Sequence, residues 1–125
     1  MRDNKYVVLC VDDDPDFLET TTIFLEANDY LVQTASSAEE GLKVYKKVNP
    51  DLVIVDLMME EVDSGTTMAR ELKFSGNKAP VFMLSSVGDQ LNMNMNFSEL
   101  GLRGVFQKPI DIKHVLSTIR TALGQ

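Results

Sequence analysis

Residues 53–57, with the sequence VIVDL, form a short apolar run that carries one carboxylate, Asp56. Pro50 and Asp51 stand just before the run and mark a break in the chain. A short β-branched run bounded by turn residues indicates a strand that is buried on both faces of a parallel sheet. Because a charge is costly inside such a strand, we expect Asp56 at its carboxyl end, where open α/β sheets place their sites. The competing interpretation is that Asp56 merely begins the next loop.

The composition is that of a one-domain globular protein. With 125 residues the chain is long enough for a sizeable core, and no stretch approaches the roughly 20 apolar residues of a membrane span. Twelve basic and nineteen acidic residues give a net charge of −7, which disfavours nucleic acid or an anionic membrane as a direct partner. The single cysteine, Cys10, excludes an internal disulfide and is expected to pack as a small buried hydrophobe. Since no signal peptide precedes the first apolar run, we expect a cytoplasmic protein.

Strand and helix alternate five times along the sequence. Apolar runs predict strands at residues 6–11, 30–34, 53–57, 81–84 and 104–107. Helices are predicted after each strand; the stretch 92–97 alternates like a strand, but the topology favours a short helix there. This order predicts a single α/β domain, residues 1–125, with a parallel sheet, helices on both faces and right-handed crossovers. No second, output domain is expected.

Capping residues and helical periodicity bound the predicted helices. Asp14 with Pro15, Ser37 with Glu40, and Asp111 have the pattern of helix N-termini. On the first helix we expect these apolar residues to face inward: Phe17, Leu18, Ile23, Phe24 and Leu25. The last helix has the clearest amphipathic pattern in the chain. Its apolar positions are Ile112, Val115, Leu116, Ile119 and Leu123, and Gly124 is expected to end it.

Chemically useful side chains stand at the ends of four predicted strands. Asp12 and Asp13 follow the first strand, Asp56 ends the third, Ser85 follows the fourth, and Lys108 follows the fifth. Because the carboxyl ends of parallel strands share one edge of the sheet, we expect these groups to converge. Crowded carboxylates repel one another unless a cation lies between them, and oxygen ligands without His or Cys favour Mg²⁺.

A carboxylate beside Mg²⁺ can attack a phosphoryl group and form an acyl phosphate. Asp56 is the expected nucleophile because it ends the central strand, while Asp12 and Asp13 are better placed as metal ligands. The Lys108 ammonium and the Ser85 hydroxyl would stabilise the charge on the phosphoryl oxygens. Taken singly, these residues have plainer interpretations: an acidic helix cap, a serine at a strand end, a solvated lysine. Their combination at four strand ends is what points to phosphoryl transfer.

These segments together resemble the receiver domain of two-component response regulators. The resemblance covers nearly the whole chain and rests on four motifs: residues 11–15 (VDDDP), 53–59 (VIVDLMM), 80–85 (PVFMLS) and 104–109 (GVFQKP). It implies a flavodoxin-like five-stranded sheet of order 2-1-3-4-5 and a lysine–proline peptide bond that is commonly cis. It also implies that Asp56 accepts a phosphoryl group from a sensor histidine kinase or a histidine phosphotransferase. Mg²⁺ would be held by Asp13, Asp56, the backbone carbonyl of Met58 and, through water, Asp12.

The resemblance implies a switch rather than a turnover enzyme. Phosphorylation would change how strongly one face of the domain binds a downstream effector protein. That face is made by the predicted fourth helix, the fifth strand and the last helix. We expect a monomer or a weak homodimer. Val105 stands where the family usually has a switch aromatic, and Phe106 should point to the other face of the sheet. Met58 and Val87 lie where side chains commonly influence the attack of water, and because both are apolar we expect slow dephosphorylation.

Three alternatives stay open at the level of sequence. Asp12-x-Asp14 with Ser85 and Lys108 also resembles the phosphatase core of haloacid-dehalogenase-like hydrolases, although this leaves Asp56 without a role. A flavodoxin-type FMN carrier has the same fold, but three aspartates after the first strand would repel the FMN phosphate, and the chain has no Trp to stack on the flavin. The third alternative is a receiver that binds its partners without phosphorylation.

Overall fold

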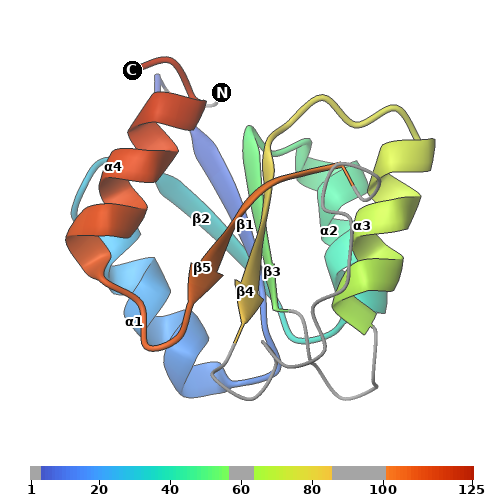
Figure 1. Cartoon of the computed structure of the whole chain (residues 1–125), viewed down its shortest axis with the longest axis horizontal. Helices are drawn as coiled ribbons and strands as arrows, with labels where there is room; N and C mark the ends of the chain where they lie inside the picture. Colours follow the sequence, from blue (N-terminus) through green and yellow to red (C-terminus); the bar gives the residue numbers. More distant parts are fainter. Residues whose placement is uncertain (1–3, 57–63, 86–100) are drawn as a thin grey trace.

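The computed structural model describes residues 4–56, 64–85 and 101–125. Within these ranges five parallel strands form one sheet in the order β2-β1-β3-β4-β5, which confirms the predicted flavodoxin-like fold (Figure 1). The strands are β1 (Val7–Val11), β2 (Leu31–Ala35), β3 (Leu52–Asp56), β4 (Val81–Ser85) and β5 (Leu102–Gln107). The described helices are α1 (Pro15–Glu26), α2 (Ala38–Val48), α3 (Ser64–Phe74) and α4 (Ile112–Ala122).

Helices cover both faces of the sheet, as predicted. The pair α1 and α4 lies on one face and the pair α2 and α3 lies on the other (Figure 1). Successive side chains of a strand alternate between the two cores: Val8 and Cys10 pack with α1 and α4, whereas Leu9 and Val11 pack on the side of α3. Every residue of β1, β3 and β4 is buried, which is why these strands are continuous apolar runs in the sequence.

Side-chain caps begin three helices at the predicted residues. The Asp14 carboxylate accepts hydrogen bonds from two backbone N–H groups of α1, and Ser37 and Asp111 each accept one from the first turn of α2 and of α4. The left-handed residue Gly124, with a φ of 75°, follows α4 as expected. α1 begins directly after its cap, Asp14, so Asp12 and Asp13 lie between the end of β1 and the start of α1.

Two apolar residues that were predicted to face inward lie at the surface instead. Ile23 is 63% exposed, because the buried positions of α1 are Thr21, Phe24 and Leu25 and position 23 is on the opposite side of the helix. Ile112 is 43% exposed, and it borders a groove beside α1 rather than the core.

Several predicted boundaries also differ from the structure. β5 begins at Leu102, two residues before the predicted start at residue 104; the start was missed because Arg103 separates Leu102 from the rest of the strand. α3, predicted only as a helix that follows the third strand, begins at Ser64. The helix predicted around residues 92–97 lies outside the described residues. Among the helices that the structure does describe, none is long and apolar enough to cross a membrane.

Candidate functional site

The predicted site residues meet at the carboxyl edge of the sheet. Asp12 directly follows β1, Asp56 is the last residue of β3, Ser85 is the last residue of β4, and Lys108 directly follows β5. Parallel pairing places Asp56 opposite Leu84, so Ser85 lies one position further along the neighbouring strand. Four separate segments therefore contribute to one site, as the alternation of strands and helices predicted.

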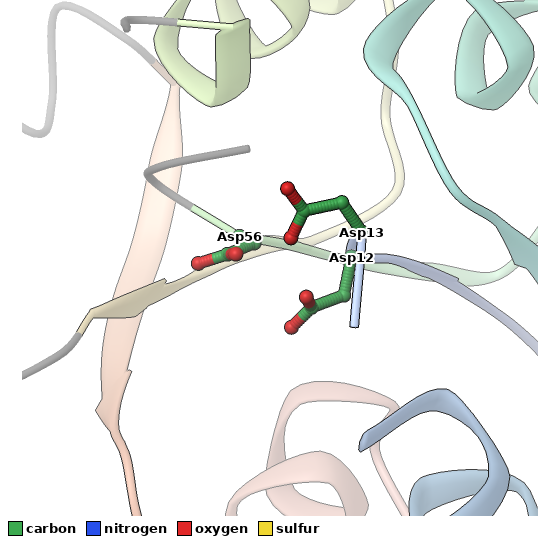
Figure 2. Close-up of side chains that lie close together, drawn as sticks. All are labelled: Asp12, Asp13 and Asp56. Atoms are coloured by element: carbon green, nitrogen blue, oxygen red, sulfur yellow. The ribbon is translucent and has the colours of Figure 1, made fainter. Parts of the chain in front are cut away.

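Three carboxylates form the centre of this edge. One oxygen from each of Asp12, Asp13 and Asp56 lies within 4.8 Å of the other two, and Figure 2 shows the side chains grouped at the ends of β1 and β3. Asp12 and Asp56 are 0% and 4% exposed, whereas Asp13 is exposed. Mg²⁺ binds oxygens at about 2.1 Å in octahedral geometry, so opposite ligands lie about 4.2 Å apart. The three carboxylates therefore fit a hard divalent cation with little adjustment.

The Lys108 ammonium supplies a positive charge to the two buried carboxylates. Its Nζ lies 2.7 Å from Oδ2 of Asp12 and 3.6 Å from Oδ2 of Asp56. Burial lowers the pKa of Lys108, but the hydrogen bond to Asp12 and the negative charge of Asp56 outweigh this effect, so the pKa lies above its usual value. Lys108 is therefore a cation at neutral pH, and it is not the solvated lysine of the plainer interpretation.

Asp12 and Asp14 have different roles in the structure. The backbone N–H of Asp12 donates to the carbonyl of Ala35 on β2 at 3.0 Å. Its Oδ1 accepts a hydrogen bond from the Asp14 N–H at 2.9 Å, and its Oδ2 accepts one from Lys108 at 2.7 Å. The Asp14 carboxylate instead caps α1 by accepting from the N–H of Asp16 at 3.0 Å. Asp14 is thus a helix cap, as predicted.

The main chain links the serine and the lysine of the site. Ser85 is 2% exposed, and its carbonyl oxygen accepts a hydrogen bond from the backbone N–H of Lys108 at 2.7 Å. The Lys108–Pro109 peptide bond is cis, as the resemblance implied. A main-chain hydrogen bond therefore joins the ends of β4 and β5 at the site.

Cys10 lies beneath the site and takes no part in it. It is on β1, two residues before Asp12, and it is fully buried. Burial raises the pKa of the Cys10 thiol, and the nearby charge of Asp12 raises it further. The thiol stays neutral and packs as a small hydrophobe, which confirms the prediction from sequence.

One neighbour of the site was missed by sequence reasoning. The centroid of the Phe17 ring lies 4.6 Å from the Lys108 Nζ. The apolar pattern predicted only that Phe17 faces the inner side of the first helix. Its place in the first helical turn, directly after the acidic residues, could have indicated that it lies near the site. Two other predicted positions, the Met58 carbonyl and Val87, lie outside the described residues.

Val105 and Phe106 point to opposite faces of the sheet, as predicted. Val105 packs against the core on the side of α2 and α3, and Phe106 is buried on the side of α1 and α4. The Phe106 ring stacks on Phe82 with centroids 4.9 Å apart, and its edge meets His114 at 6.1 Å. The aromatic side chain of this segment therefore lies inside the fold.

Comparison with known proteins identifies related sequences over nearly the whole chain. The family model described as the response regulator receiver domain matches residues 8–120. The DNA-binding dual master transcriptional regulator RpaA of Synechocystis is 32% identical over 118 residues, which cover 93% of this chain and 48% of that protein. The transcriptional regulatory protein GlrR of Escherichia coli is 34% identical over 118 residues, which cover 94% of this chain and 26% of that protein. The chain therefore spans about half the length of these relatives, or less.

Solved structures agree on the fold. A response regulator receiver domain protein from Clostridium thermocellum matches with a TM-score of 0.86 and 29% identity, covering 95% of this chain and 94% of that one. The chemotaxis response regulator CheY4 of Vibrio cholerae matches in fold with a TM-score of 0.85 and 23% identity, covering 96% of this chain and 100% of that one. The acidic pocket with Lys108 is typical of the receiver phosphoacceptor site. The family match thus favours the receiver over the hydrolase and the FMN carrier.

Proposed function

The chain belongs to the response regulator receiver family, and from this premise we propose that it is the phosphoacceptor of a two-component phosphorelay. In this proposal residues 1–125 act as one receiver unit. Asp56 takes a phosphoryl group from a sensor histidine kinase or a histidine phosphotransferase, and phosphorylation changes the affinity for a downstream effector protein. The family consists of phosphorylation switches that work with histidine kinases, rather than of turnover enzymes.

The observation that carries the proposal is the position of the Asp56 carboxylate. It is 4% exposed, belongs to the acidic cluster and has the Lys108 Nζ at 3.6 Å. A carboxylate that attacks a phosphoryl group needs positive charge close to the phosphoryl oxygens, where negative charge develops. The acidic cluster offers a position for a metal ion, and Lys108 offers an ammonium group. Both would supply positive charge beside the Asp56 carboxylate.

The acidic cluster is typical of the receiver metal site, and we assign Mg²⁺ to it. Asp13 and Asp56 would bind the ion directly, together with the Met58 carbonyl. Both oxygens of Asp12 already accept hydrogen bonds, one from the Asp14 N–H and one from Lys108, which favours contact through water for this residue. The bound ion supplies Lewis-acid stabilisation of the phosphoryl oxygens.

The residues of the chain itself then have separate tasks. An oxygen of Asp56 attacks phosphorus as the bond to the donor histidine nitrogen breaks, so the phosphoryl group passes from nitrogen to oxygen. Lys108 and Ser85 donate hydrogen bonds to the phosphoryl oxygens as negative charge accumulates there. The Lys108 ammonium is already 3.6 Å from the Asp56 carboxylate, so only a short movement is required.

The proposed switch follows from the link between Ser85 and Lys108. Phosphorylation adds about −1.5 to −2 charges beside both residues. Because the Lys108 N–H donates to the Ser85 carbonyl at 2.7 Å, attraction of both side chains to the phosphate displaces the ends of β4 and β5 together. The face that includes β5 and α4 would then change its affinity for the effector, as a shift between two populations.

Intact-mass spectrometry after incubation with acetyl phosphate tests this function. We expect one added phosphoryl group on the wild-type protein in the presence of Mg²⁺, none with EDTA, and none on Asp56→Asn. No adduct under any condition would support the receiver that binds without phosphorylation, and an adduct on Asp56→Asn would make Asp12 the residue to test. The same sample gives the rate of loss of the phosphoryl group, for which a half-life of seconds would contradict the slow dephosphorylation that we propose.

A further inference from the structure

Phe17 is the uncharged neighbour of the Lys108 ammonium. The Nζ atom lies 4.6 Å from the centroid of the Phe17 ring. This is inside the distance of about 6 Å at which the face of an aromatic ring attracts a cation. Among the residues that the structure describes, the ammonium also lies 2.7 Å from Asp12 and 3.6 Å from Asp56. The ammonium is therefore held by groups from three elements of the fold: the ends of β1 and β3, and the first turn of α1.

The segment that positions the acidic cluster also positions the Phe17 ring. The backbone N–H of Phe17 donates to Oδ1 of Asp14 at 3.4 Å, and the N–H of Asp14 donates to Oδ1 of Asp12 at 2.9 Å. The Phe17 side chain also packs against the core on the side of α1 and α4. The ring therefore has a defined position relative to Asp12, independent of the position of Lys108.

The two carboxylates change their partners in the proposed reaction, whereas the ring does not. In the proposed reaction Asp56 would become phosphorylated, and Asp12 would help to hold the bound Mg²⁺ through water. An aromatic ring does not bind Mg²⁺ or accept the phosphoryl group, so it can attract the ammonium both before and after transfer. Among the described contacts of Lys108, the one with Phe17 therefore involves neither the metal ion nor the phosphoryl group.

The surroundings strengthen this contact. Phe17, Lys108 and Pro109 line a groove of about 600 Å³ whose walls also include Ile110 and Ile112. The Lys108 side chain is only 21% exposed. Reduced hydration of the ammonium raises the strength of its attraction to the ring face.

We propose that Phe17 is a positioning residue for phosphoryl transfer, and that its ring keeps the Lys108 ammonium within reach of the phosphoryl group while Asp12 and Asp56 exchange partners. This inference rests on the proposed function, because it assigns a role in the reaction of Asp56. Phe17 itself touches none of the reacting atoms.

Site-specific fluorination of Phe17 tests the proposal. Each fluorine withdraws electron density from the ring face with little change in size, so the attraction for a cation falls stepwise. With one, two and three fluorines, we expect the logarithm of the phosphorylation rate by acetyl phosphate to fall linearly, to a total loss of about fivefold. A purely structural role of Phe17 would not produce this dependence on fluorine number.

Phe24 is the matched control for this series. It lies on the same helix and is 8% exposed, so fluorination there perturbs the same core but faces no cation in the described structure. We expect a constant rate for the Phe24 series, retention of the rate by Phe17→Tyr and loss by Phe17→Leu. The ε-methylene protons of Lys108 should have ring-current-shifted NMR resonances that return to ordinary lysine values in Phe17→Leu.

The outcomes distinguish this inference from the function on which it rests. If the wild-type protein takes up no phosphoryl group, the proposed function fails, and the role of Phe17 fails with it. If the wild-type protein is phosphorylated but the Phe17 series is flat, or declines no more than the Phe24 series, only the role of Phe17 is overturned.

Discussion

Replacing Lys108 with methionine should expose the electrostatic cost of the acidic cluster. With an effective dielectric constant of about 20, a pair of unit charges at 2.7 Å attracts by about 6 kcal/mol, and a pair at 3.6 Å by about 5 kcal/mol. The cost of desolvating the charges offsets much of this attraction, and removal of one partner from a buried pair typically costs about 3–5 kcal/mol. Because Lys108 retains 21% side-chain exposure, we expect a loss of about 3 kcal/mol in the free energy of unfolding.

Urea denaturation at neutral pH, with EDTA or with Mg²⁺, measures this loss. In EDTA, Lys108→Met should unfold with about 3 kcal/mol less free energy than the wild-type protein. Mg²⁺ should stabilise the variant more than the wild type, because the ion replaces the missing charge beside Asp12 and Asp56 and no longer competes with the ammonium. A methionine side chain keeps the apolar stem of the lysine, so the comparison isolates the charge.

Lys43→Met is the matched control. Lys43 pairs with Glu39 at 3.5 Å on the surface of α2, and the two side chains are 75% and 83% exposed. Its loss should cost less than about 0.5 kcal/mol, with no dependence on Mg²⁺. Two results would contradict this explanation. The first is a free energy of unfolding for Lys108→Met in EDTA that lies within about 1 kcal/mol of the wild-type value. The second is an equal stabilisation of Lys108→Met and wild type by Mg²⁺.

Three further predictions concern buried residues of α1, α2 and β1. Among the described residues, the Thr21 hydroxyl is buried without a hydrogen-bond partner, so Thr21→Val should raise the free energy of unfolding by about 1 kcal/mol in urea denaturation. A Cβ at Gly41 would lie 2.9 Å from Val11 Cγ2 and 3.0 Å from Met68 Cε; Gly41→Ala should therefore lower the urea midpoint despite better helix propensity, and added Met68→Ala should relieve the overlap. Because the folded pKa of Cys10 is raised, its stabilising effect is complete below the unfolded pKa of about 8.5 and is lost above it. The stability advantage of wild type over Cys10→Ala should thus shrink by about 1 kcal/mol between pH 8.5 and 9.5, and an unchanged difference would contradict the buried neutral thiol.

Local sequence patterns were sufficient for the strands of the fold and for the residues at their ends. The runs around Cys10, Ile54 and Met83 are continuous and apolar because β1, β3 and β4 are buried on both faces. The edge strand β5 carries Arg103 and Gly104, so its start was predicted two residues late. A strand with one neighbour has less need of apolar residues, and its boundary is correspondingly harder to recognise.

The contacts within the site could not be predicted in the same way. Topology placed Asp12, Asp56 and Lys108 at one edge, but it did not show that Lys108 bonds Oδ2 of Asp12 while the Asp14 N–H occupies Oδ1. It also did not show the Phe17 ring beside the ammonium, or that Ile23 faces solvent while Thr21 faces the core.

Local patterns in the sequence were enough to predict the fold class, the edge of the sheet that carries the site and the residues at that edge. These features depend on the spacing of apolar residues, with a period of about 2 in strands and about 3.6 in helices, and on helix N-caps. Both involve residues that are close together in the chain. Which atoms of these residues come into contact depends on the tertiary structure. Lys108 and Asp12 are 96 residues apart in sequence, and their contact depends on the packing of β1, β5 and α1 to within a fraction of an ångström. No local pattern encodes such a distance, because it results from the close packing of the whole core.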